Sequence, residues 1–196
     1  MDGFEVCHIA KNHQLTNHIP LVLLTAKSNL KSRVDGYKTG ADMYLTKPFN
    51  MEELRVVIEK LITSRKELQK RFTHEITLDE QVSPSLGELD QKLINNLNTY
   101  IESELSNEAL GVEDLVKESG MSHSQLYRKI KALTDFSIAG FIRNYRLIRA
   151  LEILKEGQHN VTEVADMTGF GNRRYFHKVF VEKYAYPPSE VRKLQA

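Results

Sequence analysis

One pattern of residues occurs twice in the last part of the chain, and it constrains the fold more than any other feature. The copies cover residues 112–133 and 161–184. In each, an apolar helical segment leads to a glycine, Gly120 or Gly169, and a second helical segment follows. The copies align at an offset of 49 up to the glycine and of 50 after it, so the second turn is one residue longer. Two helices joined by a short turn that contains glycine are typical of a helix-turn-helix unit.

The residues at each turn explain why the chain stops and restarts its helix there. Glycine adopts the left-handed conformation that ends a helix without the steric cost of a Cβ atom. Ser122 and Asn172 follow the turns, and side chains of these types accept hydrogen bonds from the free amides of a new helix. We therefore expect Ser122 and Asn172 to cap the second helix of each unit.

The second helix of each unit is expected to expose a basic face. Leu126 and Ile130, and in the other copy Phe176 and Phe180, have the i, i+4 spacing of an inward stripe. The expected DNA-contacting positions are His123, Ser124, Tyr127, Arg128 and Lys131 in the first copy and Asn172, Arg173, Arg174, His177 and Lys178 in the second. These groups can donate to base edges and phosphates. A merely solvated helix face is the alternative, and the repetition after a capped turn weighs against it.

A helical pattern over residues 137–156 connects the two units. At 1.5 Å per residue it would span about 30 Å, close to the roughly 34 Å between successive major-groove openings on one side of B-DNA. Arg143, Arg146 and Arg149 lie on it, and we expect at least one, Arg143 foremost, to reach a phosphate. The alternative is that Arg146 and Arg149 pair with nearby acids such as Glu152.

Charge is distributed unevenly along a chain whose net charge is only +1. Residues 122–196 hold 13 lysines and arginines against 7 acids, whereas residues 73–121 hold 2 against 11. The basic part therefore coincides with the predicted recognition helices, as expected for a nucleic-acid-binding surface. The turn-helix pattern favours duplex DNA over RNA as the partner.

The first 64 residues follow another pattern. Short apolar runs at 21–25 and 43–46 each precede a helical pattern, which predicts alternating strands and helices with a parallel sheet. Asn50 with Glu53 resembles a capping box, and the helix that it opens is expected to continue to about Phe72. Residues 65–92 are expected to form a helix extension and an acidic linker, with helix resuming at Leu93.

Several site and targeting classes find no support in the sequence. A single cysteine, Cys7, rules out an internal disulfide and fits a reducing cytoplasm. The seven histidines show no metal-ligand spacing, and no glycine-rich phosphate loop is present. We therefore expect neither a metal site, nor a cofactor, nor catalysis. No apolar run is long enough to span a membrane, and no signal-peptide pattern begins the chain.

Residues 93–196 resemble the DNA-binding domain of the AraC/XylS family of bacterial transcription regulators. The strings that carry the resemblance are GMSHSQLYRKIKALT, FIRNYRLIRALEILK, VTEVADMTGFGNRRYFHKVF and PPSEVRK. The resemblance implies that Ser124, Tyr127 and Arg128, with Arg173, Arg174, His177 and Lys178, contact bases. Asp135 and Ala185 stand where the family usually places a glycine after a recognition helix, which affects the local cap rather than DNA binding.

Residues 1–64 resemble the second half of a response-regulator receiver domain, through MDGFEVC, IPLVLLTA, GYKTGADMYLTKPF and MEEL. The resemblance implies that Thr25 binds a phosphoryl group, that Tyr44 swings with it, and that Lys47 pairs with it, before a cis peptide to Pro48. The family's phosphoacceptor and Mg²⁺-binding acids would lie before Met1. We therefore expect no phosphoacceptor in this chain, which is then a segment of a longer protein or the product of a late start.

The expected fold is mainly α, with a C-terminal tandem helix-turn-helix domain of about seven helices. It follows an N-terminal partial α/β, flavodoxin-like receiver fragment with two parallel strands. Our first hypothesis is a sequence-specific transcription regulator, the output part of a two-component phosphorelay protein fused in full length to a sensor kinase. The second is a phosphate-handling enzyme or phosphotransfer module that uses Thr25 and Lys47. Because half a receiver leaves a sheet edge and apolar surface uncovered, we also expect a homodimer through residues 1–64.

Overall fold

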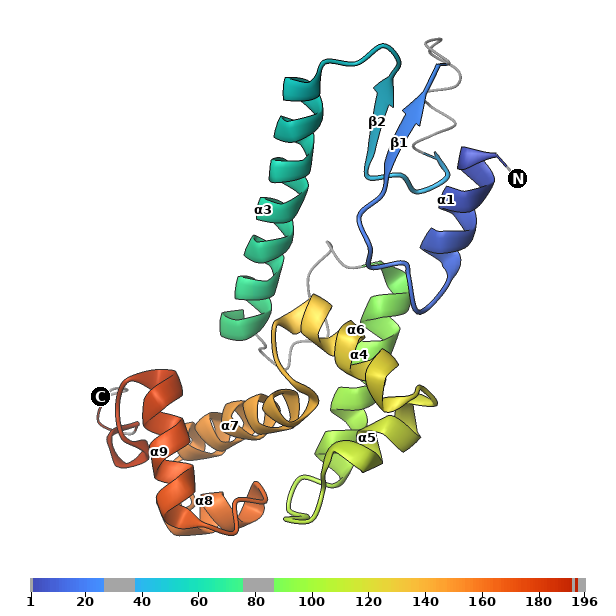
Figure 1. Ribbon diagram of the computed structural model, residues 1–196. Coiled ribbons are helices and arrows are strands. Elements are labelled where there is room, and N and C mark those ends of the chain that lie inside the picture. The colour runs from blue at the N-terminus through green and yellow to red at the C-terminus, as the bar shows by residue number, and fades with distance from the viewer. Residues whose placement is uncertain (1, 27–37, 76–86, 192, 194–196) are drawn as a thin grey trace. The chain divides into compact units, whose positions relative to one another are not determined.

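The computed structural model describes residues 2–26, 38–75, 87–191 and 193 (Figure 1). The chain divides into an N-terminal unit, made mostly of residues up to 75, and a C-terminal unit, made mostly of residues from 93 onward. The described part is mainly helical and contains two strands. This agrees with the predicted mainly α class with a small α/β fragment at the N-terminus.

The N-terminal unit contains helix α1 (Gly3–Asn12), strands β1 (Val22–Thr25) and β2 (Met43–Thr46), and helix α3 (Met51–Glu75). The strands are parallel and pair from Val22 with Met43 to Thr25 with Thr46, which confirms the predicted parallel pair. The peptide bond between Lys47 and Pro48 is cis, as the receiver resemblance implied. The helical pattern expected after β1 falls largely on residues 27–37, outside the described residues.

Side chains cap the two helices of this unit. The Asp2 carboxylate accepts from the amides of Phe4 and Glu5, and Glu5 accepts in return from the Asp2 amide, so Asp2 begins α1 as a capping box. Asn50 Oδ1 accepts from the Glu52 amide at 2.8 Å and begins α3. Helix α3 ends at Glu75, three residues beyond the predicted Phe72.

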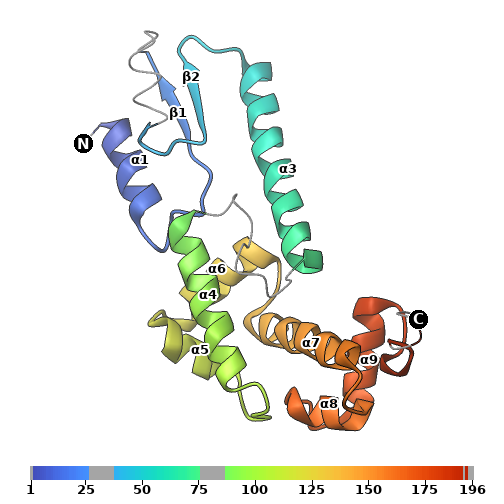
Figure 2. The same ribbon diagram turned by 180° about the vertical axis from the view of Figure 1, so that it is seen from behind.

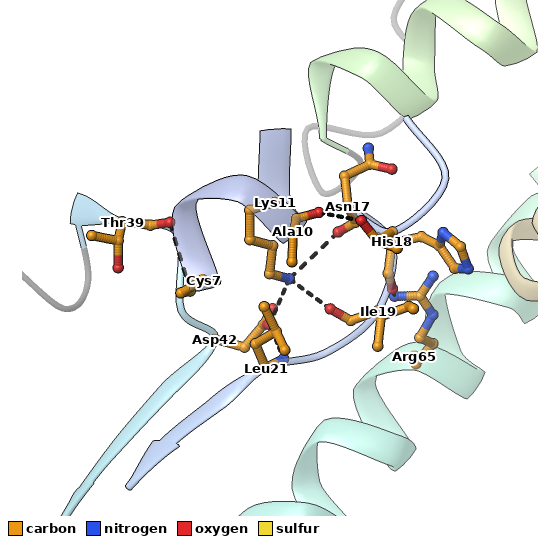
Figure 3. A network of polar contacts seen from close by, with 11 residues as sticks. Cys7, Ala10, Lys11, Asn17, His18, Ile19, Leu21, Thr39, Asp42 and Arg65 are labelled. Carbon is orange, nitrogen blue, oxygen red and sulfur yellow. Dashed lines mark hydrogen bonds and ion pairs between the residues drawn. The ribbon is translucent and has the colours of Figure 1, made fainter. Parts of the chain in front are cut away.

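Lys11 ties α1 to the segments that lead into both strands (Figure 3). Its Nζ lies 2.6 Å from Asp42 Oδ2 and donates to the Ile19 carbonyl at 3.0 Å. The same carboxylate oxygen accepts from the Leu21 amide at 2.7 Å. Arg65 of α3 donates to the His18 carbonyl, so the loop before β1 is held from two helices. These contacts fix the strand register from its amino-terminal end.

The C-terminal unit contains α5 (Val112–Ser119), α6 (His123–Thr134), α7 (Ile138–Glu156), α8 (Val161–Met167), α9 (Arg173–Tyr184) and the short helix η1 (Pro188–Glu190). They follow α4 (Glu88–Ser103), which begins five residues before the predicted Leu93. The earlier start has a physical reason. Two acids that were assigned to the linker, Glu88 and Asp90, occupy the first turn, where the helix dipole favours negative charge. The rest of the predicted linker, residues 76–86, lies outside the described residues.

Helix α7 is the core of this unit rather than an amphipathic surface helix. Its buried residues lie on all sides and include polar Asn144 and charged Arg146. The reason is that α5 packs against it, and so does α8, while its C-terminal half joins the cluster that contains Phe176 and Phe180 of α9 (Figures 1 and 2). Burial from two directions leaves only a narrow exposed strip on α7.

Several helix ends use the left-handed conformation. Gly120, Gly157 and Gly169 have φ values of 66°, 77° and 69°. Asp135 (φ 63°) and Ala185 (φ 64°) adopt the same conformation with a Cβ atom present. Ala185 therefore carries a steric cost that glycine would not.

We predict that Ala185→Gly stabilises the C-terminal unit by about 1 kcal/mol, because glycine removes the Cβ penalty at a positive φ. Chemical denaturation measures the change in the free energy of unfolding. Ala139→Gly, in the first turn of α7, is the control and is not expected to stabilise. Equal destabilisation by both substitutions would contradict the prediction.

Lys183, in the last turn of α9, is partly buried against α7, where it donates to Asn144 Oδ1. Burial lowers its pKa from 10.5 to about 8. The unfolded chain therefore binds more protons than the folded chain above pH 8, so the free energy of unfolding should rise with pH. We predict that the free energy of unfolding of the parent minus that of Lys183→Met increases from pH 8 to pH 10 and is constant below pH 7. Urea titrations across this range measure both free energies, and a decrease of this quantity with rising pH would contradict the prediction.

Candidate nucleic-acid interface

The first helix-turn-helix unit consists of α5, the turn at Gly120, and α6. Ser122 caps α6 as predicted: the Gln125 amide donates to Ser122 Oγ at 3.4 Å, and Gln125 Oε1 accepts from the Ser122 amide at 2.9 Å. Leu126 and Ile130 are completely buried. The opposite face of α6 exposes the predicted set, namely His123, Ser124, Tyr127, Arg128 and Lys131.

The second unit, α8 and α9, has the same construction. Asn172 Oδ1 accepts from the Tyr175 amide at 2.9 Å and caps α9, so this oxygen of a predicted contact residue serves the helix start. Phe176 and Phe180 are buried, with exposed fractions of 1% and 0%. The exposed residues of the first half of α9 are Arg173, Arg174, Tyr175, His177 and Lys178.

The exposed faces of α6 and α9 are rich in hydrogen-bond donors and carry little negative charge that would repel DNA. Arg128 is exposed, and its Nε donates to the Ser124 carbonyl of its own helix at 3.2 Å. Lys178 lies 3.9 Å from Glu182, one turn along α9, and both side chains are exposed. A loose surface pair of this kind is worth little energetically, so the ammonium group can exchange it for a phosphate or a base edge.

Arg143 extends the second face from α7. It is exposed, and its Nη1 donates to Tyr175 Oη at 3.2 Å. The contact brings a linker-helix guanidinium to the side of the second recognition helix. Tyr175, which is 45% exposed, was not among the predicted contact residues. Its position three residues before Lys178 was the available signal, because residues at i and i+3 share a helix face.

The other two arginines of α7 have structural partners. Arg149 lies 3.0 Å from Glu102 and 2.5 Å from Glu152, which confirms the acid-pairing alternative for this residue. Arg146 instead donates to two backbone carbonyls, those of Gly169 and Asn107, rather than to Glu152. Burial lowers the pKa of Arg146, and the nearby Glu108 carboxylate opposes that shift.

Not every basic residue of a recognition helix is exposed. Lys129 of α6 is only 1% exposed and faces the interior, next to Ile130. Its burial shows that the basic character of α6 is carried by Arg128 and Lys131, which are on the other side of the helix.

Of the predicted receiver residues, Thr25 and Lys47 lie at the carboxyl ends of the two parallel strands, and Tyr44 lies within β2. Thr25 is the last residue of β1, and the Lys47 amide donates to its carbonyl at 2.6 Å. Tyr44 pairs with Leu23 across the strands and is 7% exposed, while the Lys47 side chain is exposed. Ligands of open α/β sheets bind at this end of the strands, so Thr25 and Lys47 are at the expected edge.

The described residues contain neither a cluster of metal-binding side chains nor a membrane-spanning helix. In the ranges 2–26, 38–75 and 87–191, no three histidine, cysteine, aspartate or glutamate side chains gather closely enough to hold a metal ion. None of the helices in those ranges has the length and hydropathy required to cross a bilayer.

Two family models match the chain. Residues 115–194 match a helix-turn-helix domain, and residues 1–59 match a response regulator receiver domain. The unmatched residues 60–114 include the boundary between the N-terminal and C-terminal units. Both matches agree with the assignments made from the sequence.

Relatives match either the whole chain or its C-terminal part. The histidine kinase P4 of Formosa agariphila is 34% identical over 193 residues, which is 97% of this chain and 14% of the relative. The transcriptional activator RhaS of Salmonella arizonae is 29% identical over 103 residues, 53% of this chain and 36% of the relative. The chain thus spans only a minor part of either protein.

A solved structure supports the fold. The transcriptional regulator of Chromobacterium violaceum, described as containing an AraC-type DNA-binding domain, aligns with a TM-score of 0.50 at 22% identity. The alignment covers 54% of this chain and 94% of that one. The chain therefore contains a helix-turn-helix domain of the AraC type, C-terminal to part of a response-regulator receiver domain.

Proposed function

We propose that this chain is a sequence-specific DNA-binding transcription regulator that inserts α6 and α9 into successive major grooves of one duplex. The observation that carries the proposal is that both recognition helices expose donor-rich faces after capped turns, while their apolar stripes are buried in one unit. Arginine and lysine side chains on such helices can contact guanine edges as well as phosphates. Duplex DNA is accordingly the proposed partner, and the bacterial cytoplasm is the proposed location.

We further propose that the chain is the output part of a two-component phosphorelay protein. Its similarity to a histidine kinase over nearly all of its own length supports this, as does its similarity to an activator over the C-terminal part. In this arrangement the receiver conveys a phosphorylation signal, with Thr25, Tyr44 and Lys47 in the switch roles that the family resemblance implies. A sensor kinase in the same polypeptide would supply that signal. The phosphate-handling enzyme or phosphotransfer module that uses Thr25 and Lys47 is the alternative to this proposal.

The proposal predicts that Arg128→Ala and Lys178→Ala each weaken binding to the cognate site by about 1 to 3 kcal/mol if they contact bases. The cognate site is first obtained by selecting bound sequences from a random DNA pool. Gel shifts at fixed salt then compare each variant with the parent.

Lys155→Ala is the matched control, because Lys155 is exposed at the C-terminal end of α7 and outside both recognition faces. It should leave the affinity almost unchanged. Equal affinity for the parent, Arg128→Ala and Lys178→Ala would remove the base-contacting role from both residues. Failure to select any sequence would contradict sequence-specific binding.

We also propose that the chain forms a homodimer through residues 1–64. Helix α3 exposes Ile58 and Ile62, and α1 exposes Val6 and Ile9, with exposed fractions between 43% and 56%. Ile58 and Ile62 are one turn apart and form an apolar strip on α3. Covering such side chains would contribute hydrophobic stabilisation to an association.

We predict that the parent chain is a dimer and that the double substitution Ile58→Lys and Ile62→Lys shifts it to monomer. The reason is that burying a charged side chain in the interface costs free energy. Light scattering over a range of concentrations measures the mass. Lys60→Glu, also exposed on α3, is the control and should leave the dimer intact. A parent chain that stays monomeric at high concentration would refute the proposal.

A further inference from the structure

One buried guanidinium group connects parts of both helix-turn-helix units. Arg146 of α7 is 8% exposed. Its Nη2 donates to the Asn107 carbonyl at 2.6 Å, in the loop between α4 and α5. Its Nη1 donates to the Gly169 carbonyl at 3.1 Å, in the turn between α8 and α9. The loop leads into the first unit and the turn belongs to the second, so a single side chain joins them.

The turn of the second unit is shaped for this contact. Gly169 has a φ of 69°, and a Cβ atom there would lie 2.6 Å from the Leu105 carbonyl oxygen and 2.7 Å from Arg146 Nη2. A Cβ atom at Gly171 would overlap the carboxylate of Glu108. Both glycines therefore let the loop approach the turn backbone directly. Gly169 has two reasons to be glycine, one conformational and one steric.

The loop itself is held in shape by internal hydrogen bonds. The Asn107 amide donates to the Glu104 carbonyl at 3.0 Å, and the Leu110 amide donates to the Asn107 carbonyl at 3.1 Å. Asn107 Oδ1 accepts from the Ala109 amide at 3.0 Å. The Asn107 carbonyl, which accepts from Arg146, is thus part of a hydrogen-bonded turn immediately before α5. A displacement of this turn would move the start of α5.

Arginine suits the position better than any other side chain. Its guanidinium is planar and rigid, so it can donate in two directions at once and hold two carbonyls at a set separation. Hydrogen bonds from a charged donor are stronger than neutral ones. Glu108 beside the group supplies partly compensating charge. A lysine could reach one carbonyl as a point donor without fixing the angle between the two segments.

We propose that Arg146 is a positioning residue that locks the turn of the second unit to the loop before α5, and thereby sets the separation and orientation of α6 and α9 for simultaneous insertion into two grooves. The proposal rests on the proposed DNA-binding function. Arg146 itself does not contact DNA in this account. We call the contact of Arg146 with the Asn107 and Gly169 carbonyls the joint. If it is rigid, binding of one recognition helix to DNA raises the effective concentration of the other at its own groove, and a flexible joint loses this gain.

The joint can be tested without DNA. Spin labels are attached at Glu118→Cys on α5 and Asp166→Cys on α8 in a Cys7→Ser background, and both labelled positions are exposed. Pulsed electron resonance then measures the distance between the two helix-turn-helix units. The parent should give one narrow distance distribution, and Arg146→Met should broaden or displace it. Arg143→Met is the control, since Arg143 lies on the same helix but is exposed, and it should leave the distribution unchanged.

Glu108→Ala provides a second variant that does not disturb the core, because Glu108 is exposed in the loop. It should broaden the distribution to a smaller degree, and Arg146→Lys should be intermediate between the parent and Arg146→Met. Unchanged distributions in both Arg146→Met and Glu108→Ala would overturn the inference. Thermal unfolding of each variant identifies any that is simply unfolded, and Glu108→Ala then decides the question.

The DNA experiment separates this inference from the proposed function. For sequences selected by the parent, Arg146→Met should lose about tenfold or more in affinity for the two-groove site. The loss of affinity caused by Arg146→Met should be much smaller on a DNA site in which the sequence of one half is scrambled. Arg143→Met should weaken both sites alike. Equal losses on both sites for Arg146→Met would contradict the positioning role. A parent that binds no DNA, with an Arg146-dependent distance distribution, would refute the function and leave the joint standing.

Discussion

The packing of α7 between the two helix-turn-helix units is the constraint on which the rest of the C-terminal unit depends. A helix of 19 residues that was exposed on one side could bend or roll. Burial of Phe141 and Tyr145 on one side and of Leu154 on the other removes that freedom, since each rotation of α7 would open a gap in the core. The two recognition helices are therefore presented by one rigid element and not by a flexible tether. The proposed insertion of both helices into neighbouring grooves requires such rigidity.

Polar contacts join α7 to α4 and to α9 in addition to the apolar packing. Arg149 ties α7 to Glu102 of α4, and the hydroxyl group of Tyr145 donates to the same carboxylate at 3.1 Å. On the other side, the hydroxyl group of Tyr184 donates to the Leu147 carbonyl at 3.2 Å and holds α9. Each contact joins elements far apart in the sequence. Such bonds add directional specificity to a core whose hydrophobic contacts alone are not directional.

The sequence predicted the local features well because their causes are local. The turn at Gly120 and the caps at Ser122 and Asn172 depend on the chemistry of one or two neighbouring residues, and the structure has all of them. The start of α4 was misplaced because the acids at Glu88 and Asp90 suggested a solvated linker, whereas they complement a helix dipole. The burial of Arg146 could not be predicted, since its partners at Asn107 and Gly169 are backbone carbonyls, which leave no trace in the sequence. Tyr175 was missed because its role depends on Arg143, 32 residues away.

The most direct test of the account is hydroxyl-radical footprinting of this chain on a DNA sequence that it selects. Two recognition helices on one rigid support should protect two stretches of backbone on the same side of the duplex, with centres about 10 to 10.5 base pairs apart. A single protected stretch, or two stretches on opposite sides of the duplex, would show that α6 and α9 do not enter neighbouring grooves together.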